Sequence, residues 1–539
     1  MKENRTNFMK YLLIVLLALI GYQSQAQNIR FKIDGQEKDT TVHLVKYFGK
    51  NLFYADTAEM VNGVVSFDGS KQKPGLLALY IPNQNLLEFV YSGEEDIDIR
   101  AKGPNFMQNA QVKKSKENEL FFGYVQMIGT RRPLADQARK DQENHEEGSK
   151  QWNALKDKIE GLNKEVEDYR NNLLKNHGDM LATKILKMSF EVEVPDAPVD
   201  ENGEPLEENF RYKYYKEHYW DNIDLADDRL VRTKIFGEKL DYYFSKRMLL
   251  QHWDSILIEA FDFIDQFDIK SDYFQYCVSI LTNQYSKSKI MGMNKVYVYL
   301  GKRYYCGDDT DFKVGNRVYK GVTAEDGGTA AHWTKESQRL KLCENVNTHF
   351  NLVMGAIPPN IKLRDTTNVM YHDFMSLDSE YKVLYFWDPE CGHCKKITPK
   401  LQTLYEKKWR DRNIEIFAVG KADSEDLFEK WKKFIIANNL QFINVGLTYT
   451  MKEAAMDETP GQPKLRQLLT ETTLESLNYQ QQYDIFATPK VWILNDKNEI
   501  IAYSLTVSQL EDLFDKIQGV EDAEKIFPPE QNKEDEQMH

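Results

Sequence analysis

The segment VLYFWDPECGHC, residues 383–394, decides how the C-terminal part of this chain folds. Its first five residues are all apolar, as in a strand that is covered on both faces of a sheet. A helical pattern from Lys395 to Trp409 follows the C-x-x-C motif. The sequence therefore predicts a buried strand, a short loop and a helix, with Cys391 and Cys394 where the helix begins.

Two cysteines in this setting can cycle between a dithiol and a disulfide. The N-terminus of a helix presents unpaired N–H groups and a partial positive charge, which favour the thiolate of the first cysteine. Thiols in comparable positions have pKa values of about 3.5 to 7.5. We therefore predict that Cys391 is the nucleophile and that Cys394 is the resolving thiol.

The motif and its surroundings resemble the active site of the thioredoxin superfamily, and within it the secreted TlpA-like thiol–disulfide oxidoreductases. Trp387 stands four residues before the first cysteine and Pro399 five residues after the second, as in that family. The segment FATPKVWIL, residues 486–494, matches the family's Thr-Pro pair and the strand after it. The resemblance covers residues 355–520, about a third of the chain.

This resemblance implies a thioredoxin fold with particular roles for three residues. Pro489 is expected to be cis and to face the cysteines, since cis peptide bonds are nearly always formed at proline. Thr488 and Pro489 are expected to shape the groove for the substrate chain, and Trp387 to pack under the active-site loop. These three are the predicted substrate-binding residues.

The chain departs from the family at two places beside the motif. Thioredoxin has a buried aspartate six residues before the first cysteine, where this chain has Tyr385. Glu390 directly precedes the first cysteine, and a carboxylate there would raise the pKa of Cys391, whereas a protonated His393 would lower it. We predict Glu390 and His393 as modulating residues. A solvated loop acid is the other interpretation of Glu390 and of Asp388.

The two cysteines admit three other interpretations. A zinc site needs two more ligands at suitable spacing, but the other cysteines are isolated along the chain: Cys277, Cys306 and Cys343. Covalent haem attachment needs a histidine directly after the motif, where this chain has Lys395. A purely structural disulfide leaves the family spacings of Trp387 and Pro399 unexplained. We therefore expect no metal site and no organic cofactor.

The three isolated cysteines favour an interpretation as buried free thiols, because their odd number leaves one unpaired in any case. Oxidation of one pair among Cys277, Cys306 and Cys343 is the alternative for an exported protein. The histidines show no cluster with the spacing of metal ligands.

Residues 1–26 have the pattern of a secretory signal peptide. Three basic residues precede an apolar run at residues 11–20, and small residues end at Ala26, where cleavage is expected. The run is short for a membrane span, which needs about 20 apolar residues. We expect export to the periplasm; an uncleaved N-terminal segment that anchors the protein to the inner membrane is the alternative.

Composition narrows the classes of partner. The chain has 539 residues, so several domains are expected. Its net charge of −14 argues against nucleic acid and against anionic membrane surfaces. Five cysteines are too few for a fold stapled by disulfides, so the cores must be packed conventionally.

The pattern of the chain predicts a multidomain protein. Residues 28–112 alternate apolar and polar residues and contain Asn62-Gly63, a hairpin signal, which indicates an antiparallel, sandwich-like all-β domain. Residues 115–350 predict an all-α domain, with one apolar stripe from Leu155 to Leu173. Its tyrosine-rich segments favour aromatic packing over a surface for unfolded polypeptide. An α/β thioredoxin fold at 355–520 and an acidic, disordered tail at 521–539 complete the chain.

Within the thioredoxin-like part the elements can be placed individually. Ser424 is the predicted N-cap of a crossover helix. An insertion after residue 448 is expected to add a helix that begins at Pro463 and ends at Ser476. The remaining predicted elements are strands at 383–387 and 414–419, a hairpin at 491–503 and a last helix at 507–517.

Together these features predict an exported thiol–disulfide oxidoreductase that reduces or isomerises protein disulfides through Cys391 and Cys394. Its expected partners are proteins that contain disulfides and a membrane protein that recycles the cysteines. The alternative is an envelope protein that binds clients or has a structural role, and whose thioredoxin-like domain holds an incidental or sensing disulfide.

Overall fold

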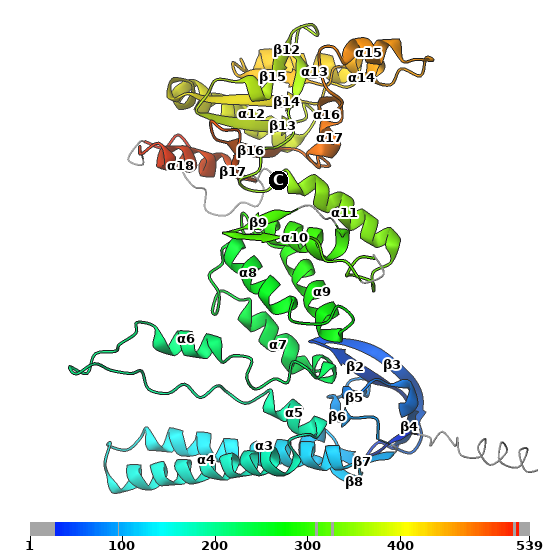
Figure 1. Ribbon diagram of the computed structural model, residues 1–539, viewed down its shortest axis with the longest axis vertical. Helices are drawn as coiled ribbons and strands as arrows, with labels where there is room; N and C mark the ends of the chain where they lie inside the picture. Colours follow the sequence, from blue (N-terminus) through cyan, green and yellow to red (C-terminus); the bar gives the residue numbers. More distant parts are fainter. Residues whose placement is uncertain (1–26, 95, 308–310, 325–327, 521–523, 528–539) are drawn as a thin grey trace, which may run out of the picture. The chain divides into compact units, whose positions relative to one another are not determined.

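The computed structural model describes residues 27–94, 96–307, 311–324, 328–520 and 524–527 (Figure 1). The predicted signal peptide and most of the predicted tail lie outside these residues. The chain divides into two compact units, which are described separately below. The first comprises the chain up to Leu250 with Lys270–Tyr276, and the second comprises Gln251–Ile269 and the chain from Cys277 onward.

The first unit begins with two four-stranded sheets. Alternate residues of β1 are buried, and the rings of Phe31 and Phe89, one from each sheet, lie 5.1 Å apart, so the expected sandwich-like all-β fold is confirmed. The sheets have the orders β4-β1-β7-β8 and β3-β2-β5-β6. Their strands are β1 (Asn28–Asp34), β2 (Thr40–Phe48), β3 (Asn51–Met60), β4 (Val64–Asp68), β5 (Gly75–Tyr80), β6 (Leu87–Tyr91), β7 (Asp96–Lys102) and β8 (Gln111–Lys114).

Two details of this β region differ from the expectation. The region is not purely antiparallel, because β1 and β7 pair in parallel. The Asn62-Gly63 turn forms as predicted, with both residues at positive φ and with Val61 and Val64 hydrogen-bonded across it. However, its flanking strands β3 and β4 belong to different sheets. The turn therefore carries the chain from one sheet to the other, which periodicity along a single strand does not reveal.

Helices make up the rest of the first unit. The predicted apolar stripe lies on α4, where Leu155 is half-buried and Leu173 is buried. Tyr219, Tyr243 and Phe244 are buried, which supports aromatic packing. The helices are α2 (Phe106–Asn109), α3 (Lys116–Gln142), α4 (Lys150–His177), α5 (Leu181–Lys187), α6 (Phe210–Glu217), the 3-10 turn η2 (Asp228–Val231) and α7 (Lys234–Tyr243).

The second unit also begins with helices. Its elements before the C-terminal sheet are α8 (Trp253–Ile264), most of α9 (Asp272–Ser286), α10 (Asn294–Gly301), the π-helical turn η3 (Lys302–Cys306), the strands β9 (Phe312–Val314) and β10 (Arg317–Tyr319), and α11 (Glu336–Phe350). The β9–β10 hairpin was not expected in this otherwise helical region.

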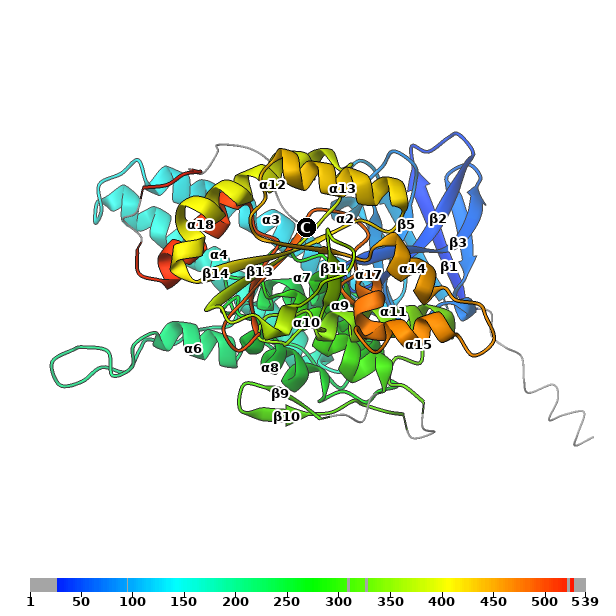
Figure 2. The ribbon, with the colours of Figure 1, turned by 90° about the horizontal axis from the view of Figure 1, so that it is seen from above.

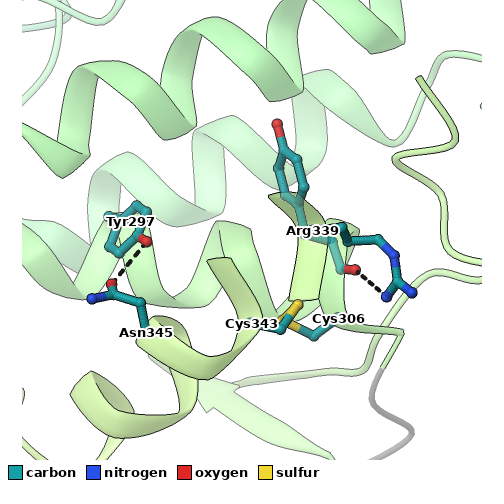
Figure 3. Close-up of a disulfide and its surroundings, with 6 residues drawn as sticks. Tyr297, Cys306, Arg339, Cys343 and Asn345 are labelled. Atoms are coloured by element: carbon teal, nitrogen blue, oxygen red, sulfur yellow. Dashed lines mark hydrogen bonds between the residues drawn. A yellow bond between two sulfur atoms is a disulfide. The ribbon is translucent and has the colours of Figure 1, made fainter. Parts of the chain in front are cut away.

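The cysteines of this region correct the expectation of three free thiols. Cys306 and Cys343 form a disulfide between η3 and α11, with their Cα atoms 5.4 Å apart (Figure 3). Cys277 is free and buried as expected, and its burial raises the pKa of its thiol. Helix packing brings together two cysteines 37 residues apart, and nothing local to either residue indicates that pairing.

A seven-stranded sheet forms the core of the C-terminal domain, with the order β12-β11-β15-β14-β13-β16-β17. The predicted central strand β13 pairs in parallel with β14 and antiparallel with β16. Its residues alternate between two apolar clusters, one on each face, which explains its unbroken apolar sequence. The strands are β11 (Lys362–Asp365), β12 (Tyr371–Asp373), β13 (Tyr381–Trp387), β14 (Ile414–Gly420), β15 (Ile443–Gly446), β16 (Lys490–Leu494) and β17 (Ile500–Tyr503).

Helices cover both faces of this sheet (Figure 2). One face is packed by α12 (Gly392–Leu404), the turn η5 (Tyr405–Trp409), α13 (Glu425–Ala437) and α18 (Val507–Ile517). The turn η6 (Arg410–Arg412) follows η5 and has no buried residue. The other is packed by η4 (Phe374–Ser376), α14 (Tyr449–Ala455), α15 (Pro463–Leu468), α16 (Leu474–Leu477) and α17 (Tyr479–Gln482). The architecture is thus the expected combination of an N-terminal β region, a helical middle region and a C-terminal α/β thioredoxin-like domain.

Local signals predicted α13 and α18 correctly and α15 only in part. Ser424 accepts a hydrogen bond from the Leu427 N–H and so caps α13 as predicted. Pro463 begins α15 as predicted, but the expected single helix to Ser476 is wrong. The chain leaves the helix after Leu468, and Thr473 caps the new helix α16. A run of threonines, which are β-branched and compete for backbone hydrogen bonds, favours this break.

Residues 524–527 of the predicted tail are docked on the domain. The backbone N–H groups of Ile526 and Phe527 donate to the buried carboxylate of Glu511 on α18. Both side chains pack against the core of that face. Among the described helices, none combines the length and the apolar character that a bilayer span requires.

Candidate redox site

The loop between β13 and α12 places both cysteines. Asp388 organises this loop, since its carboxylate accepts from the Glu390 N–H at 2.7 Å and its carbonyl accepts from the Cys391 N–H at 3.1 Å. Cys391 is the N-cap of α12, and its carbonyl accepts the first helical bond from the Lys395 N–H at 3.0 Å. The predicted position of the motif at a helix N-terminus is confirmed.

The two thiols have different surroundings. Cys391 is partly exposed, whereas Cys394 is 0% exposed. Burial opposes ionisation of Cys391, but the Cys394 N–H and thiol, together with Thr488 and the His393 backbone, outweigh it and lower the pKa of Cys391. Burial raises the pKa of Cys394 to about 12. This asymmetry is the one expected of a nucleophile and a resolving thiol.

The Thr488–Pro489 segment lies against the first cysteine. The peptide bond is cis, and the Cys391 thiol donates to the Thr488 carbonyl, with 3.3 Å between sulfur and oxygen. Pro489 is buried. The structure therefore brings Cys391 together with Thr488, which lies 97 positions further along the chain, as the sequence predicted. The role of Thr488 and Pro489 in substrate binding stays a prediction.

Trp387 lies beneath the site. Its side chain is only 1% exposed, and its ring packs against Phe434 at 5.1 Å between centroids. A pocket of about 140 Å³ opens beside it, between the end of β13 and the segment that leads to Pro489. The pocket is lined by Phe386, Trp387, Asp388, Val419, Lys421, Tyr479, Gln480, Ile485, Phe486, Ala487 and Thr488. Trp387 thus contributes to the floor of this pocket, while Phe486 is 91% exposed at its rim.

The two predicted modulating residues contribute in different ways. Glu390 forms an ion pair with Lys430 on α13, with 2.7 Å between Oε1 and Nζ. Lys430 also pairs with Asp426 at 2.6 Å, so Glu390 belongs to an exposed ion-pair cluster. His393 contributes through its backbone, as a source of the lowered pKa of Cys391. The sequence analysis did not identify Lys430 because it lies 40 residues from Glu390 in the sequence.

A buried polar chain behind the resolving cysteine was also missed. The Tyr385 hydroxyl lies 2.9 Å from Thr398 Oγ1, which donates to the Cys394 carbonyl at 2.8 Å. Burial and the nearby Cys394 raise the pKa of Tyr385, so the phenol stays neutral where thioredoxin has a carboxylate. Two features of the sequence could have indicated this series of hydrogen bonds. Thr398 follows Cys394 by one helical turn, and Tyr385 shares a strand face with Trp387.

Metal binding finds no support in the part of the chain that the structure describes. No three side chains of His, Cys, Asp or Glu come together there in an arrangement that could hold an ion.

Three family models match separate parts of the chain. Residues 379–500 match the family described as "Thioredoxin-like". Residues 28–121 and 146–313 match two families described as "Domain of unknown function", DUF4369 and DUF5106 respectively. The C-terminal part of this chain is therefore a domain of the thioredoxin superfamily, within a multidomain protein, and the TlpA-like resemblance fits it.

Similar solved structures come from bacteria. A domain of a possible thiol-disulfide isomerase from Cytophaga hutchinsonii is 26% identical; the match covers 31% of this chain and 94% of that one, with a TM-score of 0.24. The thioredoxin domain of a thiol-disulfide oxidoreductase from Bacteroides vulgatus is 21% identical over 31% of this chain and 97% of that one, with a TM-score of 0.23. A thioredoxin-like protein from Bacteroides caccae is 15% identical over 60% and 96%, with a TM-score of 0.37. No curated protein matches this chain.

Proposed function

We propose that this protein is an exported thiol–disulfide oxidoreductase that reduces or isomerises disulfides in other proteins. The observation that carries the proposal is the pairing of a partly exposed thiol of lowered pKa, Cys391, with a buried thiol of raised pKa, Cys394. A thiolate is the attacking species in disulfide exchange, and a second thiol within reach resolves the mixed disulfide.

The reaction follows from this geometry. The Cys391 thiolate attacks one sulfur of a substrate disulfide, whose S–S bond breaks as a mixed disulfide forms, and the departing substrate thiolate takes up a proton. Cys394 then loses its proton and attacks the Cys391 sulfur, which releases the second substrate thiol and leaves a Cys391–Cys394 disulfide. Two electrons pass to the substrate. A membrane protein that supplies dithiol electrons would return the pair to its reduced form.

The substrate chain would lie beside Thr488 and over the pocket next to it. Phe486, at the rim of that pocket, offers an apolar contact for residues that flank a substrate cysteine. A largely exposed aromatic side chain beside a reactive thiol is suited to bind exposed apolar segments of a misfolded protein.

Substitution of the two cysteines tests the proposal. Cys391→Ser should abolish turnover of a protein disulfide, whereas Cys394→Ser should accumulate mixed disulfides. Cys277→Ala, which removes the buried free thiol outside the site, is the control and should retain turnover. Iodoacetamide at mildly acidic pH should label Cys391 in the reduced protein. Preferential labelling of Cys394, or full turnover without Cys391, would refute the assignment.

We infer a reducing or isomerising role over a primary oxidising one. The Gly392-His393 pair resembles that of protein disulfide isomerases, near −180 mV, against about −270 mV for thioredoxin. We expect a potential between these values, measured by equilibration with glutathione buffers. A potential as high as the ~−120 mV of DsbA, with a fully oxidised pair in cells, would reverse the assigned direction.

Export is part of the proposal and rests on the signal-peptide pattern. Cell fractionation should recover the protein in the periplasm, and N-terminal sequencing should begin at Gln27. Recovery of an uncleaved chain in the inner membrane would support the anchored form instead. If the Cys391–Cys394 disulfide stays oxidised with every reductant whose potential is near that of the cytosol, the alternative of a structural envelope protein is favoured.

A further inference from the structure

Helix α11 precedes the residues that match the thioredoxin-like family and is anchored at three points. Cys343 is bonded to Cys306 on η3. The Tyr297 hydroxyl on α10 donates to Asn345 Oδ1 at 3.0 Å, and Arg339 donates to the Tyr305 carbonyl at 3.5 Å (Figure 3). The helix therefore has a fixed position against α10 and η3, and its last turn can hold a neighbouring segment in place.

His349 on that last turn reaches the loop that leads to the active-site proline. Its Nδ1 lies 2.9 Å from the Asn345 carbonyl, and its Nε2 lies 3.5 Å from Asp484 Oδ2. A carbonyl can only accept, so Nδ1 must carry a proton. In the neutral ring Nε2 is then an acceptor that faces a carboxylate. Protonation turns Nε2 into a donor and adds a positive charge toward Asp484.

Asp484 stands at the base of this loop. Its backbone is in the left-handed region, with φ 52°, and its carbonyl accepts from Lys490 Nζ. Lys490 directly follows Pro489, so this contact closes the loop on itself. Within the loop, Thr488 presents the carbonyl that accepts from the Cys391 thiol. Asp484 is therefore joined to the group beside the nucleophile by a short loop that is closed at both ends.

We propose that His349 is a positioning residue of the redox site: when protonated, it pairs with Asp484 and holds residues 484–488 against Cys391. Histidine changes its charge between about pH 5 and 8. The pair forms only with the charged ring, so the restraint is present at the acidic end of that range and is lost as pH rises. The effect on turnover rests on the proposed function.

Other ionisable side chains lie beside Asp484, on α11 and on the elements that pack against α11. Lys490 also faces the Asp484 carboxylate, with 3.7 Å between Nζ and Oδ2. Tyr297 and Lys302 belong to α10 and η3, which pack against α11. Glu344 and Lys341 lie on α11 itself. Lysine, tyrosine and glutamate have ordinary pKa values outside the range of pH 5 to 8, whereas that of histidine lies within it.

Amide hydrogen exchange on the reduced, full-length protein tests the proposal without any turnover. After correction for intrinsic exchange, the amides of Ile485 and Phe486 should be about twofold to fivefold better protected at pH 6 than at pH 8, the effect of a partly exposed ion pair. His349→Gln and Asp484→Asn should each remove the difference. His372→Gln is the matched control, because His372 on the edge strand β12 pairs at 3.7 Å with Asp365 on the neighbouring strand β11.

A kinetic measurement then links the loop to the site. KM for a protein disulfide should rise by a similar factor from pH 6 to pH 8, with a smaller rise in His349→Gln than in the unchanged protein. Equal protection at both pH values, or the same pH dependence in His349→Gln, would overturn the proposal. If the protein shows no turnover but the pH-dependent protection is observed, the proposed function is refuted and the role of His349 in holding the loop is supported.

Discussion

At the scale of single residues, Phe486 is a largely exposed aromatic side chain beside the redox site. It is 91% exposed and borders the pocket beside Thr488. We expect Phe486→Ala to raise KM for a protein disulfide about fivefold, the effect of losing ~1 kcal/mol of apolar contact. Turnover of a small disulfide such as oxidised glutathione should change little, because a small substrate does not reach the rim.

Ile436→Ala provides the control for this substitution, since Ile436 is an apolar side chain of α13 that is 76% exposed. It should leave both KM values unchanged. If Phe486→Ala and Ile436→Ala behave alike, or if both substrates are affected equally by Phe486→Ala, the rim of the pocket does not contact the client.

At the scale of elements, the Cys306–Cys343 disulfide ties α11 to η3 across 37 residues. A cross-link of this span stabilises a protein by about 2–4 kcal/mol, largely by restricting the unfolded chain. We expect the double variant Cys306→Ser/Cys343→Ser to lose free energy of unfolding of this size in urea titrations. Cys391→Ser/Cys394→Ser, whose thiols are free in the structure, should lose little. Titration of five rather than three free thiols in the unfolded, unreduced protein would contradict the pairing.

Helix α18 carries a buried acidic pair whose charge should set the acid stability of the domain. Asp515 is fully buried and pairs with Arg412 at 2.6 Å and Lys525 at 2.9 Å. Burial opposes its ionisation, but these cations outweigh it and lower the pKa of Asp515. A carboxyl whose pKa is lower in the folded state stabilises the protein above its unfolded pKa of about 3.9, and this contribution is lost as pH falls through the folded value.

We therefore expect Asp515→Asn to lower the free energy of unfolding at pH 7 by about 2 kcal/mol, because Arg412 and Lys525, which are partly buried, lose a charged hydrogen-bond partner. The variant should also show a weaker loss of stability between pH 5 and pH 2 than the unchanged protein, measured by urea unfolding at each pH. Asp512→Asn, on the more exposed side of the same helix, is the comparison. If Asp515→Asn and the unchanged protein lose stability in parallel as pH falls, Asp515 is not responsible for the acid sensitivity.

At the scale of the whole molecule, the limits of the folded C-terminal domain can be tested with fragments. The family match begins at residue 379, after β11 and β12. Yet Ile361, Leu363 and Phe374 are fully buried in the core of one face of the sheet, and β11 pairs with β15. Burial of each such side chain contributes about 1.5–3 kcal/mol, so together they approach the total stability of ~5–15 kcal/mol of an average domain.

We expect a fragment of residues 355–539 to fold and to reduce small disulfides, whereas a fragment of residues 379–539 should fail to fold. Thermal unfolding followed by circular dichroism distinguishes them. Equal melting temperatures would mean that β11 and β12 are dispensable. The boundaries inferred from sequence at residues 112–115 and 350–355 stay predictions, and the two compact units do not coincide with them, because Gln251–Ile269 belongs with the second unit.

The sequence by itself determined the thioredoxin-like fold and the place of the two cysteines at the start of a helix, whereas their order of action stays a prediction. These features depend on short-range patterns: an apolar strand, a motif at a helix N-terminus, and a Thr-Pro pair before a strand. The tertiary structure alone decided the Cys306–Cys343 pairing, the ion pair between Glu390 and Lys430, and the contact between His349 and Asp484. Each of these joins side chains from different elements, and their proximity depends on packing that no local pattern records.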